Sequence, residues 1–125
     1  MPKILIVEDY KDLSDFYQEF LREDTLLTAS DGETAVSFYK EYNPDVVLMD
    51  LKLPNKSGID AIKEILQFDP KAKIIAITAY GSTIGSKALE AGAKEVLRKP
   101  IRFDELKDTI EKYKSCWIYL YNWGN

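Results

Sequence analysis

Histidine is absent from this 125-residue sequence, and cysteine occurs only once, as Cys116. A lone thiol cannot close an internal disulfide bond, so a disulfide-stabilised scaffold is excluded and a reducing compartment is compatible with the chain. The absence of histidine also excludes an imidazole from any site that the chain builds alone.

Positive charge is not in excess either. Lys and Arg number 17 against 21 Asp and Glu, which gives a net charge of −4 and an isoelectric point near 4.9. Nucleic-acid binding needs clustered cations that neutralise phosphates, so we expect no direct contact with nucleic acid. The apolar run ILIV near the N-terminus is too short for a signal peptide or a membrane span, so a cytoplasmic protein without a membrane segment is expected.

The composition that is present, 46% hydrophobic and 30% charged, is typical of one globular domain. Short aliphatic runs recur along the chain, with amphipathic segments between them. Most runs lack a polar alternation, which is typical of parallel strands covered on both faces. These runs predict strands at 4–7, 26–29, 46–49, 74–78 and 95–99.

The amphipathic segments predict helices. The clearest apolar face is spaced i, i+3, i+4, i+7, i+8 and consists of Leu13, Phe16, Tyr17, Phe20 and Leu21. Similar or weaker patterns predict helices at 35–42, 59–66, 84–91 and 103–113. Turn pairs and a capping glycine stand at the boundaries: Asp31-Gly32, Asn43-Pro44, Asp69-Pro70 and Gly92. The alternation predicts an α/β domain over residues 1–115, a doubly wound (βα)5 fold with a five-stranded parallel sheet flanked by five helices.

Polar residues stand at the carboxyl ends of four of the five predicted strands. The carboxyl ends of parallel strands meet at one edge of the sheet, where ligands bind in such folds. Each of these residues alone is typical of a solvated loop or a surface charge, but their coincidence favours a site. They are Glu8 and Asp9 after the first strand, Asp50 directly after the third, Thr78 as the last residue of the fourth and Lys99 as the last residue of the fifth.

Three carboxylates brought to one edge repel each other strongly. A hard divalent cation relieves this repulsion, and Mg²⁺ combines carboxylate ligands with phosphate oxygens. One carboxylate can then act as a nucleophile on phosphorus, while Lys99 and the Thr78 hydroxyl stabilise the transferred phosphoryl group. The pattern therefore indicates Mg²⁺-dependent phosphoryl transfer.

The segments that carry these residues resemble a known family. They are ILIVED (4–9), ASDGETAV (29–36), PDVVLMDLKLPNKSGID (44–60), IIAITAYG (74–81), ALEAGAKEVLRKP (88–100) and FDEL (103–106). Over residues 3–114 the chain is similar to the receiver domain of response regulators, the CheY-like superfamily of two-component signalling. The resemblance implies a flavodoxin/CheY-like fold and a signalling phosphoprotein that catalyses its own phosphorylation and dephosphorylation, not an enzyme acting on other substrates.

The resemblance also implies roles for single residues. Asp50 would accept the phosphoryl group. Mg²⁺ would be held by Asp9 and Asp50, by Glu8 through water and by the backbone carbonyl of Lys52. Thr78 and Lys99 would contact the phosphoryl group, and the Lys99–Pro100 bond would be cis.

Two positions near the site bear on switching. Val96 stands three residues before the lysine, where many family members carry an aromatic residue or histidine, so the usual coupling of Thr78 to that side chain is not implied here. Tyr80, two residues after Thr78, is a bulky neighbour. Lys52 and Tyr80 occupy the positions that influence dephosphorylation in the family, and their size predicts a long-lived phosphoryl group.

The resemblance implies partners as well. Because the chain has no histidine, its phosphoryl group would come from a separate sensor histidine kinase, a phosphotransfer protein or a small phosphodonor. It would signal to a downstream target protein, as a monomer or as a phosphorylation-linked dimer. The alternative is a protein-interaction module that keeps the fold without being phosphorylated. A haloacid-dehalogenase-type phosphatase is disfavoured because the DLK sequence at 50–52 lacks the second aspartate of its signature.

The last ten residues, CWIYLYNWGN (116–125), are unlike the rest of the chain and have no counterpart in the family. Their aromatic residues alternate along the sequence, as in a strand, and are Trp117, Tyr119, Tyr121 and Trp123. Trp117 is equally in phase with the preceding helix. A docking segment and a non-native end both fit this composition, so the sequence assigns no function to the tail.

Overall fold

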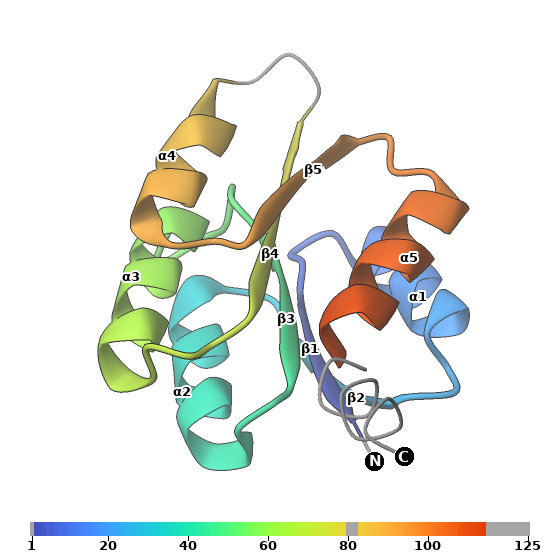
Figure 1. Ribbon diagram of the computed structural model, residues 1–125, viewed down its shortest axis with the longest axis horizontal. Helices are drawn as coiled ribbons and strands as arrows, with labels where there is room; N and C mark the ends of the chain where they lie inside the picture. The colour runs from blue at the N-terminus through green and yellow to red at the C-terminus, as the bar shows by residue number, and fades with distance from the viewer. Residues whose placement is uncertain (1, 80–82, 115–125) are drawn as a thin grey trace, which may run out of the picture.

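The computed structural model describes residues 2–79 and 83–114, so Tyr80 and the tail 116–125 lie outside the described residues. Within these described residues, ten elements alternate between strand and helix (Figure 1). The strands are β1 (Lys3–Val7), β2 (Thr25–Ala29), β3 (Val46–Asp50), β4 (Ile74–Ala79) and β5 (Glu95–Lys99). The helices are α1 (Lys11–Phe20), α2 (Gly32–Tyr42), α3 (Gly58–Phe68), α4 (Ile84–Ala91) and α5 (Phe103–Lys114).

The strands form one parallel sheet in the order β2-β1-β3-β4-β5. This confirms the predicted doubly wound fold. The chain moves outward from β1 to β2 on one side and from β3 to β5 on the other, so the strand order reverses between β1 and β3. In open α/β sheets a ligand crevice lies at this reversal, beyond the carboxyl ends of the strands.

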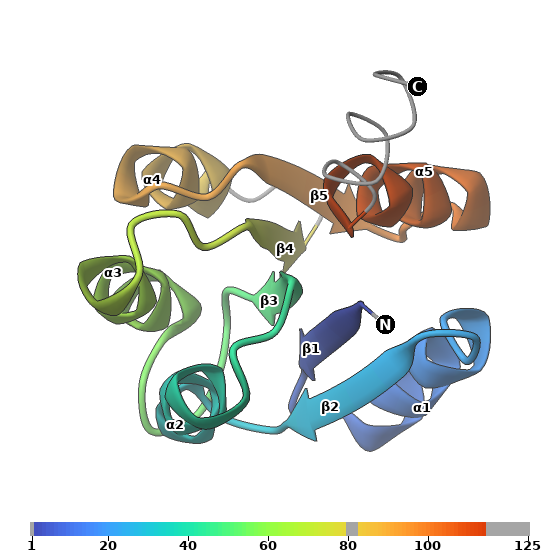
Figure 2. The same ribbon diagram turned by 60° about the horizontal axis from the view of Figure 1, so that its bottom comes forward.

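Helices cover both faces of the sheet (Figure 2): α1 and α5 lie on one side, and α2, α3 and α4 on the other. Successive side chains of a strand point to opposite faces, and β1 shows this directly. Ile4 and Ile6 pack into the core under α1 and α5, whereas Leu5 and Val7 pack into the core under α2 to α4. Each of these four side chains is at most 1% exposed.

The prediction that most strands are covered on both faces holds for the inner strands of the sheet. All five residues of β3 are buried, but β2 and β5 each contain exposed residues, among them Thr25, Thr28 and Arg98. The reason is position, because β2 and β5 are the edges of the sheet. Sequence runs alone do not show which strands will be edges.

The helix boundaries follow local capping chemistry. The Asp31 carboxylate accepts a hydrogen bond from the Thr34 N–H at 2.7 Å and caps the start of α2. Asn43 ends the same helix in the left-handed region, at φ 48°. Gly92 ends α4 at φ 116°, a conformation that a glycine adopts without a steric penalty. No helix among the described residues has the length and apolar character to cross a membrane.

Helix α1 departs from the predicted apolar face in one respect. Tyr17 and Leu21 are buried as predicted, but Phe16 is 43% exposed. It lies where α1 meets α5, and its ring stacks on that of Phe103, which is itself 51% exposed, with centroids 5.2 Å apart. Phe16 therefore belongs to a surface aromatic contact between two helices and not to the sheet-facing core.

Candidate functional site

Three carboxylates meet beyond the carboxyl ends of β1 and β3. Glu8 and Asp9 follow β1, and Asp50 is the last residue of β3. These strands are neighbours, with Val7 opposite Met49, so the next residues on each strand lie close together. One carboxylate oxygen from each of Glu8, Asp9 and Asp50 lies within 4.8 Å of the others. Glu8 and Asp50 are 3% and 4% exposed, whereas Asp9 is exposed.

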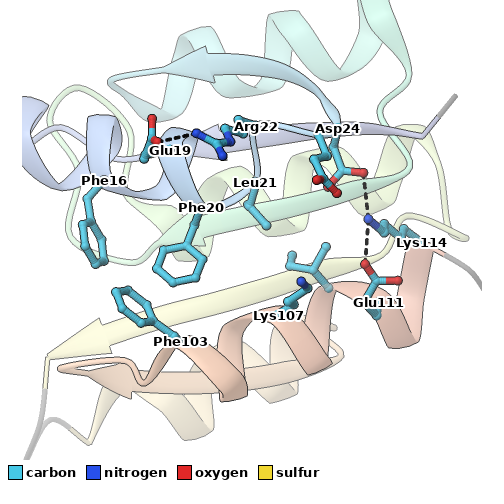
Figure 3. A pocket seen from close by; sticks show the side chains of 12 residues that line it. Phe16, Glu19, Phe20, Leu21, Arg22, Asp24, Phe103, Lys107, Glu111 and Lys114 are labelled. Atoms are coloured by element: carbon cyan, nitrogen blue, oxygen red, sulfur yellow. Dashed lines mark hydrogen bonds and ion pairs between the residues drawn. The ribbon is translucent and has the colours of Figure 1, made fainter.

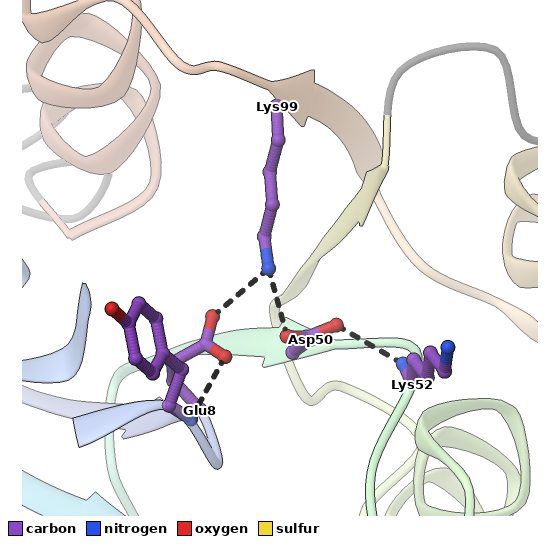
Figure 4. A network of polar contacts seen from close by, with 5 residues as sticks. Glu8, Asp50, Lys52 and Lys99 are labelled. Carbon is purple, nitrogen blue, oxygen red and sulfur yellow. Dashed lines mark hydrogen bonds and ion pairs between the residues drawn. The ribbon is translucent and has the colours of Figure 1, made fainter. Parts of the chain in front are cut away.

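The Lys99 side chain reaches down from the end of β5 to this cluster (Figure 4). Its Nζ donates to Glu8 Oε1 at 3.2 Å and to Asp50 Oδ2 at 3.0 Å. Two buried carboxylates thus share one ammonium group. The ammonium compensates part of the desolvation cost that two buried charges carry.

The backbone after β3 completes the surroundings of Asp50. Its second oxygen, Oδ1, accepts a hydrogen bond from the Lys52 N–H at 3.0 Å (Figure 4). The chain then returns to the strand, since the Gly58 N–H donates to the Leu51 carbonyl at 3.1 Å. Both Asp50 oxygens are held by donors, so the orientation of the carboxylate is fixed by the fold.

Gly58 is a site residue that sequence reasoning missed. A Cβ at this position would lie 2.4 Å from the Asp50 carbonyl oxygen and 2.6 Å from the Leu51 Cα. Only glycine allows the first turn of α3 to approach the backbone of Asp50 this closely. The signal was present as the glycine in the stretch KSGID, but nothing in that stretch tells what the glycine approaches.

The carboxylates of the cluster repel one another, and a bound cation would relieve this repulsion. Burial raises the pKa of Glu8 to about 7, with the neighbouring Asp50 carboxylate adding to the rise and Lys99 opposing it. For Lys99, burial lowers the pKa, but its hydrogen bonds and charge contacts with Asp50 and Glu8 outweigh burial and raise the pKa above its usual value. The protein thus carries more acid charge here than one lysine neutralises.

Thr78 and Asp50 line a common cavity. Thr78 is 3% exposed at the end of β4, and the cavity, of about 290 Å³, is lined by Asp50, Lys52, Thr78 and Ile84 among others. Ile84 is the first residue of α4, so the cavity borders the start of that helix. The structure therefore brings Glu8, Asp9, Asp50, Thr78 and Lys99 to one edge of the sheet, as the sequence predicted.

The remaining predicted positions lie around this edge. The Lys99–Pro100 peptide bond is cis. Val96 is half-buried against α4, where a Cβ added at Gly85 would come within 3.1 Å of the Val96 Cγ1 atom. Helix α4 is therefore packed closely on the small side chain of Val96. Tyr80 lies outside the described residues.

The donor set suits a hard divalent cation. Carboxylate oxygens from three side chains, two buried and one exposed, match the ligands that Mg²⁺ prefers while leaving a side open to water and a phosphate. Softer thiolate or imidazole ligands are absent from the cluster. The residues at this edge therefore fit a magnesium ion.

Comparison with known proteins places these features in a family. The family model described as the response regulator receiver domain matches residues 4–111. The chain is 42% identical to protein CcdB of Bacillus subtilis over 111 residues, covering 86% of this chain and 91% of that protein. It is 37% identical to the chemotaxis protein CheY of the same organism over 114 residues, covering 88% and 95%.

Solved structures of receiver domains are also similar to this chain. A receiver domain of a sensor histidine kinase from Pseudomonas aeruginosa, with magnesium coordinated in its active-site cleft, is similar at a TM-score of 0.85 with 28% identity, covering 91% of this chain and 98% of that one. The receiver domain of Ssk1 from Saccharomyces cerevisiae was crystallised with the histidine phosphotransfer protein Ypd1. The similar chain in that complex has a TM-score of 0.84 with 31% identity, covering 90% and 88%.

Proposed function

This chain belongs to the response regulator receiver domain family, and from that premise we propose that Asp50 is the residue that accepts a phosphoryl group. The observation that carries the proposal is the placement of Asp50. Its carboxylate is buried, oriented by the Lys52 N–H and the Lys99 ammonium, and grouped with two further carboxylates. Burying a carboxylate beside other carboxylates is costly for stability, and such groups cluster at functional sites.

The chemical step follows from this geometry. An oxygen of the Asp50 carboxylate attacks the phosphorus of the donor, and a new P–O bond forms as the bond from phosphorus to the leaving group breaks. With a phosphohistidine donor, the electron pair of that P–N bond stays on the imidazole nitrogen, which takes up a proton. Lys99 and the Thr78 hydroxyl contact the equatorial oxygens of the transferred group and stabilise its charge.

Mg²⁺ would be held by Asp9 and Asp50 directly, by Glu8 through water and by the Lys52 carbonyl. When bound, it neutralises charge on the phosphoryl oxygens and on the carboxylates. The chain's own residues align the acceptor: the Lys52 N–H fixes one Asp50 oxygen, and Lys99 holds the other. Burial of Glu8 and Asp50 keeps bulk water away from the acceptor.

The donor histidine lies outside residues 1–125, since these residues contain no histidine. We assign this role to a sensor histidine kinase or a histidine phosphotransfer protein, and the complex of Ypd1 with a similar receiver domain supports the second. A small phosphodonor such as acetyl phosphate would serve in its place. We place the protein in the cytoplasm, as a monomer or as a phosphorylation-linked dimer.

The output is a change in a protein-interaction face. A phosphoryl group on Asp50 adds charge and acceptor oxygens next to Thr78, and the shared cavity connects both to Ile84 at the start of α4. A shift of Thr78 would change its packing near Ile84 and so move the start of α4. Helix α4 would pass this movement to β5, because Gly85 of α4 packs against Val96 of β5. A downstream protein that binds one of the two states would read this change.

Intact-mass spectrometry after incubation with Mg²⁺ and acetyl phosphate tests the proposal. We expect the wild type to gain one phosphoryl group that is lost in base, and we expect Asp50→Asn and EDTA-treated wild type to gain none. An exposed acid on α4, changed as Glu90→Gln, is the matched control and should leave the adduct unchanged. No adduct on the wild type would favour the alternative of an interaction module that works without phosphorylation.

A further inference from the structure

A groove away from the acid cluster runs between α1 and α5 (Figure 3). It measures about 400 Å³. At one end three phenylalanine rings meet: Phe16 and Phe20 from α1, and Phe103 from α5. Phe16 and Phe103 are 43% and 51% exposed, so the rings leave apolar surface open to solvent.

The charges around this groove are largely matched among themselves. Arg22 pairs with Glu19 at 2.9 Å, and Lys114 pairs with Asp24 at 2.7 Å and with Glu111 at 2.8 Å. The groove therefore combines an aromatic cluster at one end with charged side chains that are largely paired, which leaves little net charge to attract an ionic ligand. An uncharged, aromatic occupant fits it best.

The chain itself supplies a segment of that chemistry. Residues 115–125, SCWIYLYNWGN, contain no charged side chain. They follow Lys114 directly, and Lys114 lines the groove and is held in it by Asp24 and Glu111. A segment joined to the end of its own groove is present there at an effective concentration on the order of millimolar, which no separate partner matches at ordinary protein levels.

The length of the extended tail matches the length of the groove along α5. The tail's aromatic residues recur at every second position, so in an extended chain they share one face. Trp117 and Trp123 are six positions apart, which corresponds to about 20 Å of extended chain. Helix α5 has 12 residues and is about 18 Å long, so a tail that turns back after Lys114 reaches Phe103 at the far end.

We propose that residues 115–125 dock in cis in the α1–α5 groove, with Trp and Tyr side chains against Phe16, Phe20 and Phe103. Docking covers the exposed phenylalanine rings and removes four aromatic side chains of the tail from water. The inference concerns the surface between α1 and α5 and is independent of phosphorylation, so its test stands apart from that of Asp50.

The chain carries its own reporter, because its two tryptophans, Trp117 and Trp123, both lie in the tail. Acrylamide quenching of tryptophan fluorescence in the full chain measures how exposed the tail is. We expect both indoles to be shielded, and we expect Phe16→Asp and Phe103→Asp each to raise the quenching constant several-fold. Phe68→Asp is the matched control and should change nothing, since Phe68 is 54% exposed and belongs to α3, which lies on the opposite side of the sheet from α1 and α5 (Figure 2).

Each outcome is decisive. Freely quenched tryptophans in the wild type, or shielding that survives both groove substitutions, would overturn the proposal. Shielding that disappears on dilution would show that a second copy fills the groove and would overturn docking in cis. Far-UV circular dichroism verifies that the variants are folded, and nuclear Overhauser contacts between tail indoles and the Phe16 or Phe103 rings test the same contact in the unmodified chain.

Discussion

At the scale of single residues, Glu8 shows most clearly that the site was not shaped for stability. Its carboxyl is 3% exposed and lies beside a second buried acid, and its pKa rises from 4.5 to about 7 mainly because of burial. An acid whose pKa is raised on folding holds a proton in the folded state that the unfolded state has lost. The contribution of Glu8 to the free energy of unfolding is therefore fully present below pH 4.5. It is lost as the pH rises through about 7.

Replacing Glu8 tests this sign. In EDTA, we expect Glu8→Gln to gain about 1 to 3 kcal/mol of unfolding free energy relative to wild type as the pH rises from 4.5 to 7. Urea unfolding at a series of pH values measures the difference. Glu90→Gln, on the exposed side of α4, should follow the wild-type profile. Parallel profiles for Glu8→Gln and wild type would contradict the role given to burial.

Lys52 contributes to the site through both its backbone and its side chain. Its N–H orients Asp50, and its exposed side chain lines the cavity that Asp50 and Thr78 share. If Asp50 is phosphorylated as we propose, this side chain would hinder a water molecule that approaches the aspartyl phosphate through the cavity. We expect Lys52→Asn to shorten the lifetime of the phosphorylated protein several-fold, measured by intact mass after the donor is removed. Lys71→Asn, which alters an exposed lysine just before β4, is the control, and equal lifetimes for Lys52→Asn and wild type would disprove the effect.

At the scale of elements, the C-terminal end of α5 is anchored by a shielded ion pair. Lys114 and Asp24 lie 2.7 Å apart, and their side chains are only 14% and 10% exposed. Lys11 and Asp15 on α1 form a pair of the same length but are 84% and 53% exposed. The two pairs differ in burial and not in distance, so they allow a matched comparison.

We expect Lys114→Met to lower the unfolding free energy by about 1 to 3 kcal/mol, because it leaves the Asp24 carboxylate shielded without its ammonium partner. Lys11→Met should produce no measurable change, since water already screens that pair. Denaturant unfolding at one pH compares the two variants. Equal effects would show that burial does not set the value of the Lys114 pair.

The elements also show where sequence patterns succeed and where they stop. Strand positions, helix α4 and the caps at Asp31, Asn43 and Gly92 were predictable because they depend on local periodicity and backbone preference. The exposure of Phe16 was not predictable from the sequence. The 3.6-residue period identifies the apolar face of a helix, but it does not show which neighbouring element covers the residues at the edge of that face. The edge positions of β2 and β5 depend on strand order in the same way.

At the scale of the whole molecule, the strand order explains how the site is assembled. Because β1 and β3 are neighbours, Glu8 and Asp50 meet although they are 42 positions apart, and β5 brings Lys99 across from the far side of the sheet. Sequence reasoning found these residues because all parallel strands end at one edge. It missed Gly58, whose close approach to the Asp50 backbone is visible only in three dimensions.

The central claim is that Asp50, and neither of the two acids beside it, receives the phosphoryl group. Its most direct test is to phosphorylate the full chain with acetyl phosphate and Mg²⁺, reduce the adduct with borohydride, and map the product by peptide mass spectrometry. Borohydride converts an aspartyl phosphate into homoserine and leaves free carboxylates unchanged. We expect homoserine at position 50 alone. Reduction products at Asp9 or Glu8, or none at position 50, would contradict the assignment.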